Sequence, residues 1–157
     1  MTKAPHEKIL LIGYGNPARE DDGLGPSVAD EIEKLAIDGI TVDADYQLTV
    51  EYAAAVAEYD TVIFVDASVS GREPFSLNRL TPERQESFSS HSITPEAVLG
   101  LAQELFSAGT SAYILGIRGY SFSMFTETMT EKAQVNREKA LKFLVPMLRS
   151  KSFQLTA

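Results

Sequence analysis

Three continuous apolar runs constrain the fold of this chain more than any other feature of its 157 residues. They are KILLIG at residues 8–13, TVIFVDA at residues 61–67 and AYILGI at residues 112–117. Runs of this kind have no polar face to turn toward water, which is typical of strands that are covered on both sides in a parallel sheet. The chain therefore has to place helices on both faces of its sheet.

The segments between these runs supply the helices. Apolar residues recur at helical spacing in residues 26–37, from Val28 to Leu35, and again after Thr94 and Pro95, a capping residue and a first-turn proline. The other expected elements are a strand at 40–44, a short helix at 50–58, a strand nearer an edge at 75–80, and helices from 95 to about 105 and at 130–148. This alternation predicts one domain spanning residues 1–157, an α/β fold with three layers (α/β/α) around a mainly parallel, twisted sheet.

Composition narrows the chemistry. The formal net charge of −8 argues against nucleic acid and anionic membranes as partners, because both need a basic face. The chain has no cysteine, so a metal site must be built from His, Asp, Glu and backbone oxygens. Of the two histidines, His6 and His91, only His91 is expected to be held inside the fold. The apolar run near the N-terminus is too short for a signal peptide or a membrane span, and we expect a cytoplasmic monomer.

A glycine-rich turn after the first strand carries an unusual number of acids. GYGNPAREDDG at residues 13–23 begins like a dinucleotide-binding loop, but it places Glu20, Asp21 and Asp22 where a pyrophosphate would sit. A nucleotide-binding module is therefore the weaker alternative. We interpret Glu20 and Asp21 as carboxylates that complement the positive N-terminal end of the following helix.

Asp22 has two companions elsewhere in the chain. Asp66 ends the second apolar run and His91 lies in the loop before the next helix, so all three follow strands of the predicted sheet. In open parallel sheets, ligands bind outside the carboxyl ends of the strands. Two carboxylates and an imidazole suit a divalent ion such as nickel or zinc. Taken singly, an Asp that ends a strand can also cap a turn, and a loop His can simply be solvated, so both readings stay open.

A longer stretch around the acidic turn carries a resemblance. Residues 13–25, G-Y-G-N-P-A-R-E-D-D-G-L-G, resemble the N-terminal signature of the hydrogenase maturation protease family, G-x-G-N-x-x-x-x-D-D-G-x-G. V-D-A at residues 65–67 and S-S-H at residues 89–91 are similar to the places where that family carries its second acidic ligand and its histidine. The order of the expected strands and helices agrees over nearly the whole chain.

The resemblance implies roles for individual residues. Asp22, Asp66 and His91 would be both the metal-contacting and the catalytic residues, and Asn16 would pin the glycine turn through side-chain hydrogen bonds. A Ser-His-Asp route through Ser68, Ser70 or Ser90 is the weaker alternative, because the sequence has no G-x-S-x-G turn at these serines.

The resemblance also implies an activity. The protein would be an endopeptidase, a hydrolase that removes the C-terminal extension of a nickel-loaded [NiFe]-hydrogenase large-subunit precursor and uses the nickel for recognition. The precursor supplies the nickel, and another divalent ion such as zinc could occupy the site. Residues 46–52 and 118–126 are where substrate identity would be read. A non-catalytic chaperone that binds nickel or the precursor is the alternative from a different functional class.

Overall fold

The computed structural model describes residues 7–84 and 93–156 of the chain. Its strands are β1 (Ile9–Tyr14), β2 (Ile40–Asp45), β3 (Thr61–Ser68), β4 (Phe75–Arg79) and β5 (Ser111–Arg118). Its helices are the 3-10 turn η1 (Glu20–Gly23) and the α-helices α1 (Leu24–Leu35), α2 (Tyr52–Val56), α3 (Pro95–Phe106) and α4 (Glu131–Ser150). None of the helices in these described ranges is both long enough and apolar enough to cross a membrane.

The five strands form one sheet in the order β2-β1-β3-β5-β4. The pairs β1–β2, β1–β3 and β3–β5 are parallel, and β4 alone runs antiparallel, at the edge beside β5. The three apolar runs are therefore the three central strands. The predicted edge position of the 75–80 strand is confirmed. Because four strands run in parallel, the loops that follow β1, β2, β3 and β5 all leave from one edge of the sheet.

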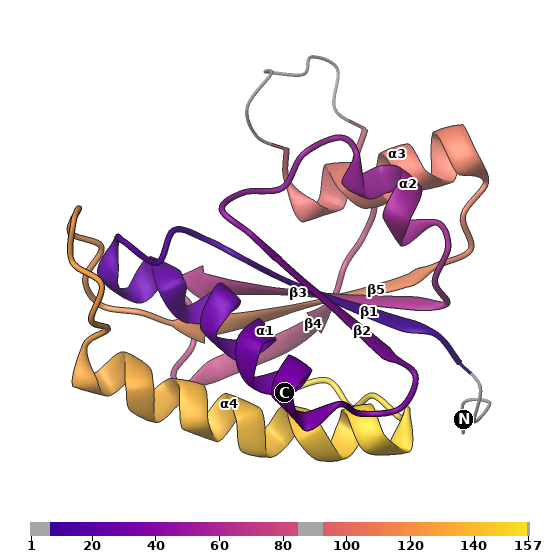
Figure 1. The fold of residues 1–157 in the computed structure, drawn as a ribbon. Coiled ribbons are helices and arrows are strands. Elements are labelled where there is room, and N and C mark those ends of the chain that lie inside the picture. Colours follow the sequence, from indigo (N-terminus) through magenta and orange to yellow (C-terminus); the bar gives the residue numbers. More distant parts are fainter. Residues whose placement is uncertain (1–6, 85–92, 157) are drawn as a thin grey trace.

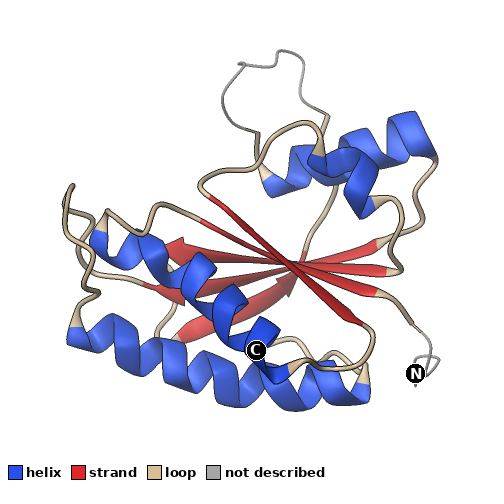
Figure 2. Cartoon of the chain, viewed as in Figure 1, coloured by secondary structure: helices blue, strands red, loops and turns tan. Residues whose placement is uncertain are grey.

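Helices cover both faces of the sheet (Figures 1 and 2). Ile9 and Leu11 of β1 belong to a core shared with α1 and α4, whereas Leu10 and Ile12 belong to a second core shared with α2 and α3. Successive side chains of a strand point to opposite faces, so one short apolar run fills both cores. The predicted α/β/α sandwich with a mainly parallel sheet is confirmed.

Two helix predictions need correction. Helix α1 begins at Leu24 and ends where Ala36 takes a left-handed φ of 48°, so it starts and stops earlier than expected. Leu35 and Leu105 both fit the apolar spacing of their helices, which predicts that they face inward, but 45% and 63% of their surface is exposed. Each lies in the last turn of its helix, so the buried stripe ends one turn before the helix does.

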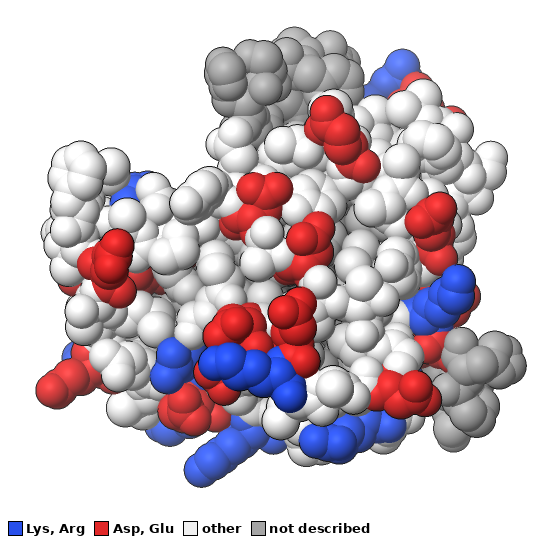
Figure 3. Space-filling view, viewed as in Figure 1, with Lys and Arg blue, Asp and Glu red and all other residues white. Residues whose placement is uncertain are grey.

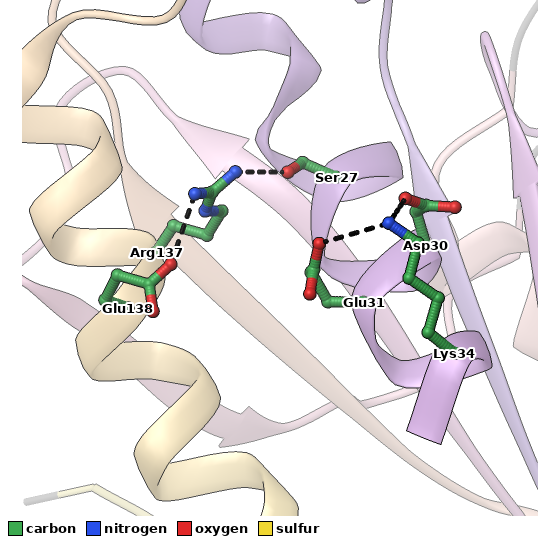
Figure 4. Close-up of polar contacts among 6 residues, drawn as sticks. All are labelled: Ser27, Asp30, Glu31, Lys34, Arg137 and Glu138. Atoms are coloured by element: carbon green, nitrogen blue, oxygen red, sulfur yellow. Dashed lines mark hydrogen bonds and ion pairs between the residues drawn. The ribbon is translucent and has the colours of Figure 1, made fainter. Parts of the chain in front are cut away.

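Helices α1 and α4 lie side by side on the same face and are joined by a polar contact (Figure 4). Nη1 of Arg137 in α4 donates to Oγ of Ser27 in α1 at 2.8 Å. Lys34 pairs with Asp30 at 3.0 Å and with Glu31 at 3.6 Å along α1, but these groups are largely exposed and contribute little to stability. The hydrogen bond to Ser27 joins the first turn of α1, which directly follows the acidic turn, to α4.

Candidate functional site

Two of the three predicted site residues, Asp22 and Asp66, lie near each other at the carboxyl edge of the sheet. Asp22 lies in η1, directly after β1, and Asp66 lies near the end of β3, the strand next to β1. The turn η1 packs against β3, and the pKa of Asp66 is raised mainly by burial, with a smaller contribution from the charge of Asp22. The third predicted residue, His91, lies outside the described residues.

The position of Asp22 depends on the glycine turn. Gly15 has a φ of 142°, which residues with a side chain rarely adopt, and a Cβ at this position would lie 2.1 Å from the backbone oxygen of Asp22. Oδ2 of Asp22 accepts the amide N–H of Asn16 at 2.7 Å. Oδ1 of Asn16 in turn accepts the amide N–H of Ala18 at 2.9 Å, which confirms that Asn16 pins the turn with its side chain.

These contacts show the role of the Asp22 carboxylate in the glycine-rich turn. In a phosphate-binding loop, the backbone N–H groups after the glycines point at the anion. Here the carboxylate of Asp22 already takes the Asn16 amide, and the side chain of Asn16 takes the amide of Ala18. The turn supplies its own negative charge, so its chemistry suits a cation and opposes a pyrophosphate.

The carboxylate of Asp66 is more buried than an ordinary surface carboxylate. Burial, reinforced by the charge of Asp22, raises the pKa of Asp66 from 3.8 to about 6, although a side-chain hydrogen bond with Tyr14 and the backbone of Ala67 act in the opposite direction. The pKa of Tyr14 is raised as well, first by burial and then by Asp66. Sequence reasoning missed Tyr14. The parallel register could have indicated this residue. Gly13 of β1 pairs with Val65 of β3, so the residues that follow them, Tyr14 and Asp66, are neighbours on adjacent strands.

Glu20 and Asp21 do something other than complement the end of α1, so this interpretation needs correction. Asp21 is fully buried. Its carboxylate accepts four hydrogen bonds, from the amides of Tyr120 (2.7 Å), Ser121 (3.1 Å) and Thr130 (2.8 Å) and from the Thr130 hydroxyl (2.8 Å). Glu20 accepts from the Ser121 hydroxyl at 2.7 Å. Both carboxylates therefore bind the segment between β5 and α4, about a hundred residues away.

The donor set fits a divalent cation in part. Across residues 7–84 and 93–156, no group of three His, Cys, Asp or Glu side chains is arranged to hold a metal. Asp22 and Asp66 supply two carboxylates, the hard oxygen ligands that suit divalent ions, and a third ligand would have to come from His91 or from the partner that brings the ion. The structure thus brings these two carboxylates, the acidic pair, to one edge of the sheet, and a metal site there stays a prediction.

A hollow lies beside the glycine turn. It has a volume of about 230 Å³ and lies between the glycine turn, the start of α1 and the end of β2. Its lining residues are Gly15, Pro17, Pro26, Ala44, Asp45 and Tyr46. Gly15 also packs against the backbone of Asp22, so the hollow shares one residue with the turn that holds Asp22, while Asp22 and Asp66 are not among its lining residues.

The fold and the acidic pair define an α/β/α protein with a carboxylate site at the carboxyl edge of its sheet, and known proteins share this fold. The maturation protease HycI of Thermococcus kodakarensis superposes with a TM-score of 0.71 at 23% identity, over 91% of this chain and 93% of its own. For the hydrogenase maturating endopeptidase HybD of Escherichia coli the TM-score is 0.66 at 21% identity, over 94% and 96% of the two chains.

Sequence similarity points the same way. A protein of Methanocaldococcus jannaschii, whose name proposes a hydrogenase maturation protease, is 24% identical over 147 residues, or 87% of this chain and 94% of that protein. No protein-family model matches the chain. The chain therefore has the fold of the [NiFe]-hydrogenase maturation proteases, and the resemblance found in its sequence is confirmed.

Proposed function

We propose that this protein is an endopeptidase that removes the C-terminal extension of a nickel-loaded [NiFe]-hydrogenase large-subunit precursor. The observation that carries the proposal is the proximity of Asp22, in η1, to Asp66, near the end of β3, at the carboxyl edge of a sheet whose fold is shared with maturation proteases. The pair stands where open parallel sheets bind their ligands. The proteins to which the chain is similar are named as hydrogenase maturation proteases, which supports this class of activity.

The donor set favours recognition of a metal that belongs to the substrate. A cysteine-free site of carboxylates, with the imidazole of His91, competes poorly for nickel with the thiolates of a hydrogenase subunit. It can instead add oxygen and nitrogen ligands to an ion that stays with the precursor. Such an ion would polarise the scissile carbonyl or lower the pKa of a water molecule.

The residues of this chain position the acidic pair. The Asn16 amide holds one oxygen of Asp22, so that the carboxylate cannot rotate freely. Tyr14 contacts Asp66 from the strand next to it, and burial of Asp66 keeps water from screening its charge. Both ligands are thus set before the precursor arrives, which lowers the cost of ordering them on binding.

Incubation with the purified, nickel-loaded precursor tests the proposal. Mass spectrometry should show loss of a C-terminal peptide with the unaltered protein, and no loss with Asp22→Asn or Asp66→Asn. Glu33→Gln is the matched control, because it removes one negative charge from the exposed surface of α1 and should leave cleavage unchanged. Cleavage at the normal rate by Asp22→Asn would overturn the role of the acidic pair.

The substrate provides a second control. A precursor prepared without nickel should remain uncut by the unaltered protein, and loading it with nickel should restore cleavage. If the protein binds the loaded precursor tightly but never shortens it, the chaperone alternative replaces the endopeptidase. If the metal-free precursor is processed as fast as the loaded one, nickel is not the recognition signal.

A further inference from the structure

The segment between β5 and α4, residues 119–130, is fastened along the acidic turn. We call it the β5–α4 loop. The amide of Glu20 donates to the carbonyl of Thr126 at 2.7 Å, and the amide of Thr126 donates to the carbonyl of Ala18 at 2.9 Å. Together with the four hydrogen bonds to Asp21, these contacts hold the loop at both of its ends.

The start of the loop is shaped to fit Asp21. A Cβ at Gly119 would lie 2.8 Å from Cβ of Asp21 and 2.9 Å from the ring of Phe122, so only glycine lets the loop approach this closely. Farther along, Oε1 of Glu20 also accepts the amide of Ser123 at 3.2 Å. The loop is therefore held along the acidic turn by contacts on both sides of its tip, at Ser123 and at Thr126.

The tip of the loop exposes two large apolar side chains. Met124 is 53% exposed and Phe125 is 89% exposed. Phe125 also has a φ of 61°, a left-handed conformation that is strained for a bulky residue and that glycine would adopt without cost. A phenyl ring that is exposed and held at a strained backbone position does not stabilise the core. Contact with a partner protein would give this side chain a role.

The tip carries no charge. Residues 120–126 contain no Asp, Glu, Lys or Arg, in a chain whose net charge is −8. In the space-filling view the loop stands out from the body as a mostly white projection, separate from the acidic groups at the centre of this face (Figure 3). An uncharged, apolar projection fits an apolar protein surface, because docking there desolvates no charged group.

Other exposed apolar residues follow parallel strands at the same edge. Tyr46, just after β2, is 70% exposed, and Val69, just after β3, is also 70% exposed. With Met124 and Phe125 after β5, loops that follow three different strands expose apolar side chains at the same edge of the sheet as the acidic pair. A partner that uses these contacts together has to present a broad surface, which a folded protein does and a short free peptide does not.

We propose that Met124 and Phe125 dock an uncharged, apolar patch of the folded precursor and so hold its C-terminal segment over Asp22 and Asp66. The proposal rests on the proposed function, since the docked partner is the substrate of that site. Glu20 and Asp21 serve this contact by fixing the β5–α4 loop against the turn that carries Asp22. The same acidic turn thus has one carboxylate for the metal and two for the docking loop.

The test compares two double variants. Met124→Ser with Phe125→Ser removes the tip, and Leu105→Ser with Phe106→Ser is the matched control, because these residues are 63% and 50% exposed at the end of α3, at the opposite edge of the sheet. Binding of the nickel-loaded precursor is measured by biolayer interferometry, and cleavage by mass spectrometry. The tip variant should bind at least tenfold more weakly and cleave correspondingly less at low precursor concentration, while the control matches the unaltered protein.

A glycine variant separates docking from folding. Phe125→Gly relieves the left-handed strain, so its Tm should stay the same or rise while precursor binding falls. Unchanged precursor binding by the tip variant would overturn the docking proposal, even if cleavage by the unaltered protein supports the proposed function. If the unaltered protein binds the precursor without cutting it, the endopeptidase function fails and weaker binding by the tip variant still supports docking. If it neither binds nor cuts the precursor, both proposals fail.

Discussion

Asp22 accepts the amide N–H of Asn16, with 2.7 Å between Oδ2 and the nitrogen. A carboxylate from the far end of the turn thus closes the glycine loop in which it lies. The contact holds Asp22 beside the end of β3, where Asp66 is partly buried. The carboxylates of Asp22 and Asp66 repel each other in this partly buried environment unless a cation lies between them. This repulsion affects the stability of the protein.

Asp66 should lower the stability of the protein at neutral pH. Burial is the main cause that raises its pKa from 3.8 to about 6. Because the folded-state pKa lies above the unfolded one, the contribution of the Asp66 carboxyl to stability is fully present below about pH 4 and is lost as pH rises through about 6. Asp66→Asn should therefore raise the free energy of unfolding by roughly 1–3 kcal/mol at pH 8.

Urea denaturation of the metal-free protein at two pH values checks this. The difference between Asp66→Asn and the unaltered protein should be large at pH 8 and close to zero at pH 4. An equal difference at both pH values would mean that the effect comes from packing and not from the charge of Asp66.

Asp21 should be among the most sensitive polar residues in the described part of the chain. Asp21→Asn keeps the shape but turns an NH2 group toward N–H and O–H donors that now bind carboxylate oxygens. Hydrogen bonds to a charged group are worth about 1.5–3 kcal/mol, so the free energy of unfolding should fall by roughly 2–4 kcal/mol. Chemical denaturation measures the loss, and Asp38→Asn, at an exposed position, serves as the control.

Thr130 and Thr94 cap two helices in the same way but differ in one contact. Each side-chain oxygen accepts an amide N–H from the first turn of its helix, at 3.2 Å from Ala133 and at 3.1 Å from Ala97. Only Thr130 also donates to the buried carboxylate of Asp21. Thr94→Ala should cost about 1 kcal/mol, and Thr130→Ala about 1–2 kcal/mol more. Equal losses in thermal denaturation would show that the bond to Asp21 contributes nothing.

Ile32 and Leu101 test how well helical spacing alone predicts burial. Both fit an apolar stripe in the sequence, but Ile32 is 1% exposed whereas Leu101 is only partly buried at the margin of its core. Ile32→Ala should cost roughly 2–5 kcal/mol and Leu101→Ala less than about 2 kcal/mol. Guanidinium denaturation of the two variants gives both values, and a larger loss for Leu101→Ala would mean that the two helix faces are misassigned.

The strands and the edge at which the site lies could be predicted from the sequence because both depend on local patterns. A continuous apolar run indicates a strand buried on two faces, whichever residues cover it. The rule that parallel strands direct their following loops to one edge then brings Asp22 and Asp66 together without any coordinates. The helix ends were less predictable, as Leu35 and Leu105 show, because spacing gives the direction of a side chain but not where the core stops.

The separate roles of the three acids in the turn were decided by tertiary structure. Glu20, Asp21 and Asp22 are adjacent and carry the same chemistry, so no local pattern tells them apart. What separates them is the β5–α4 loop, about a hundred residues away, whose amides and hydroxyls meet Asp21 and Glu20 but leave Asp22 facing the end of β3. A carboxylate takes its role from the donors that surround it, and those donors are assembled only when the chain has folded.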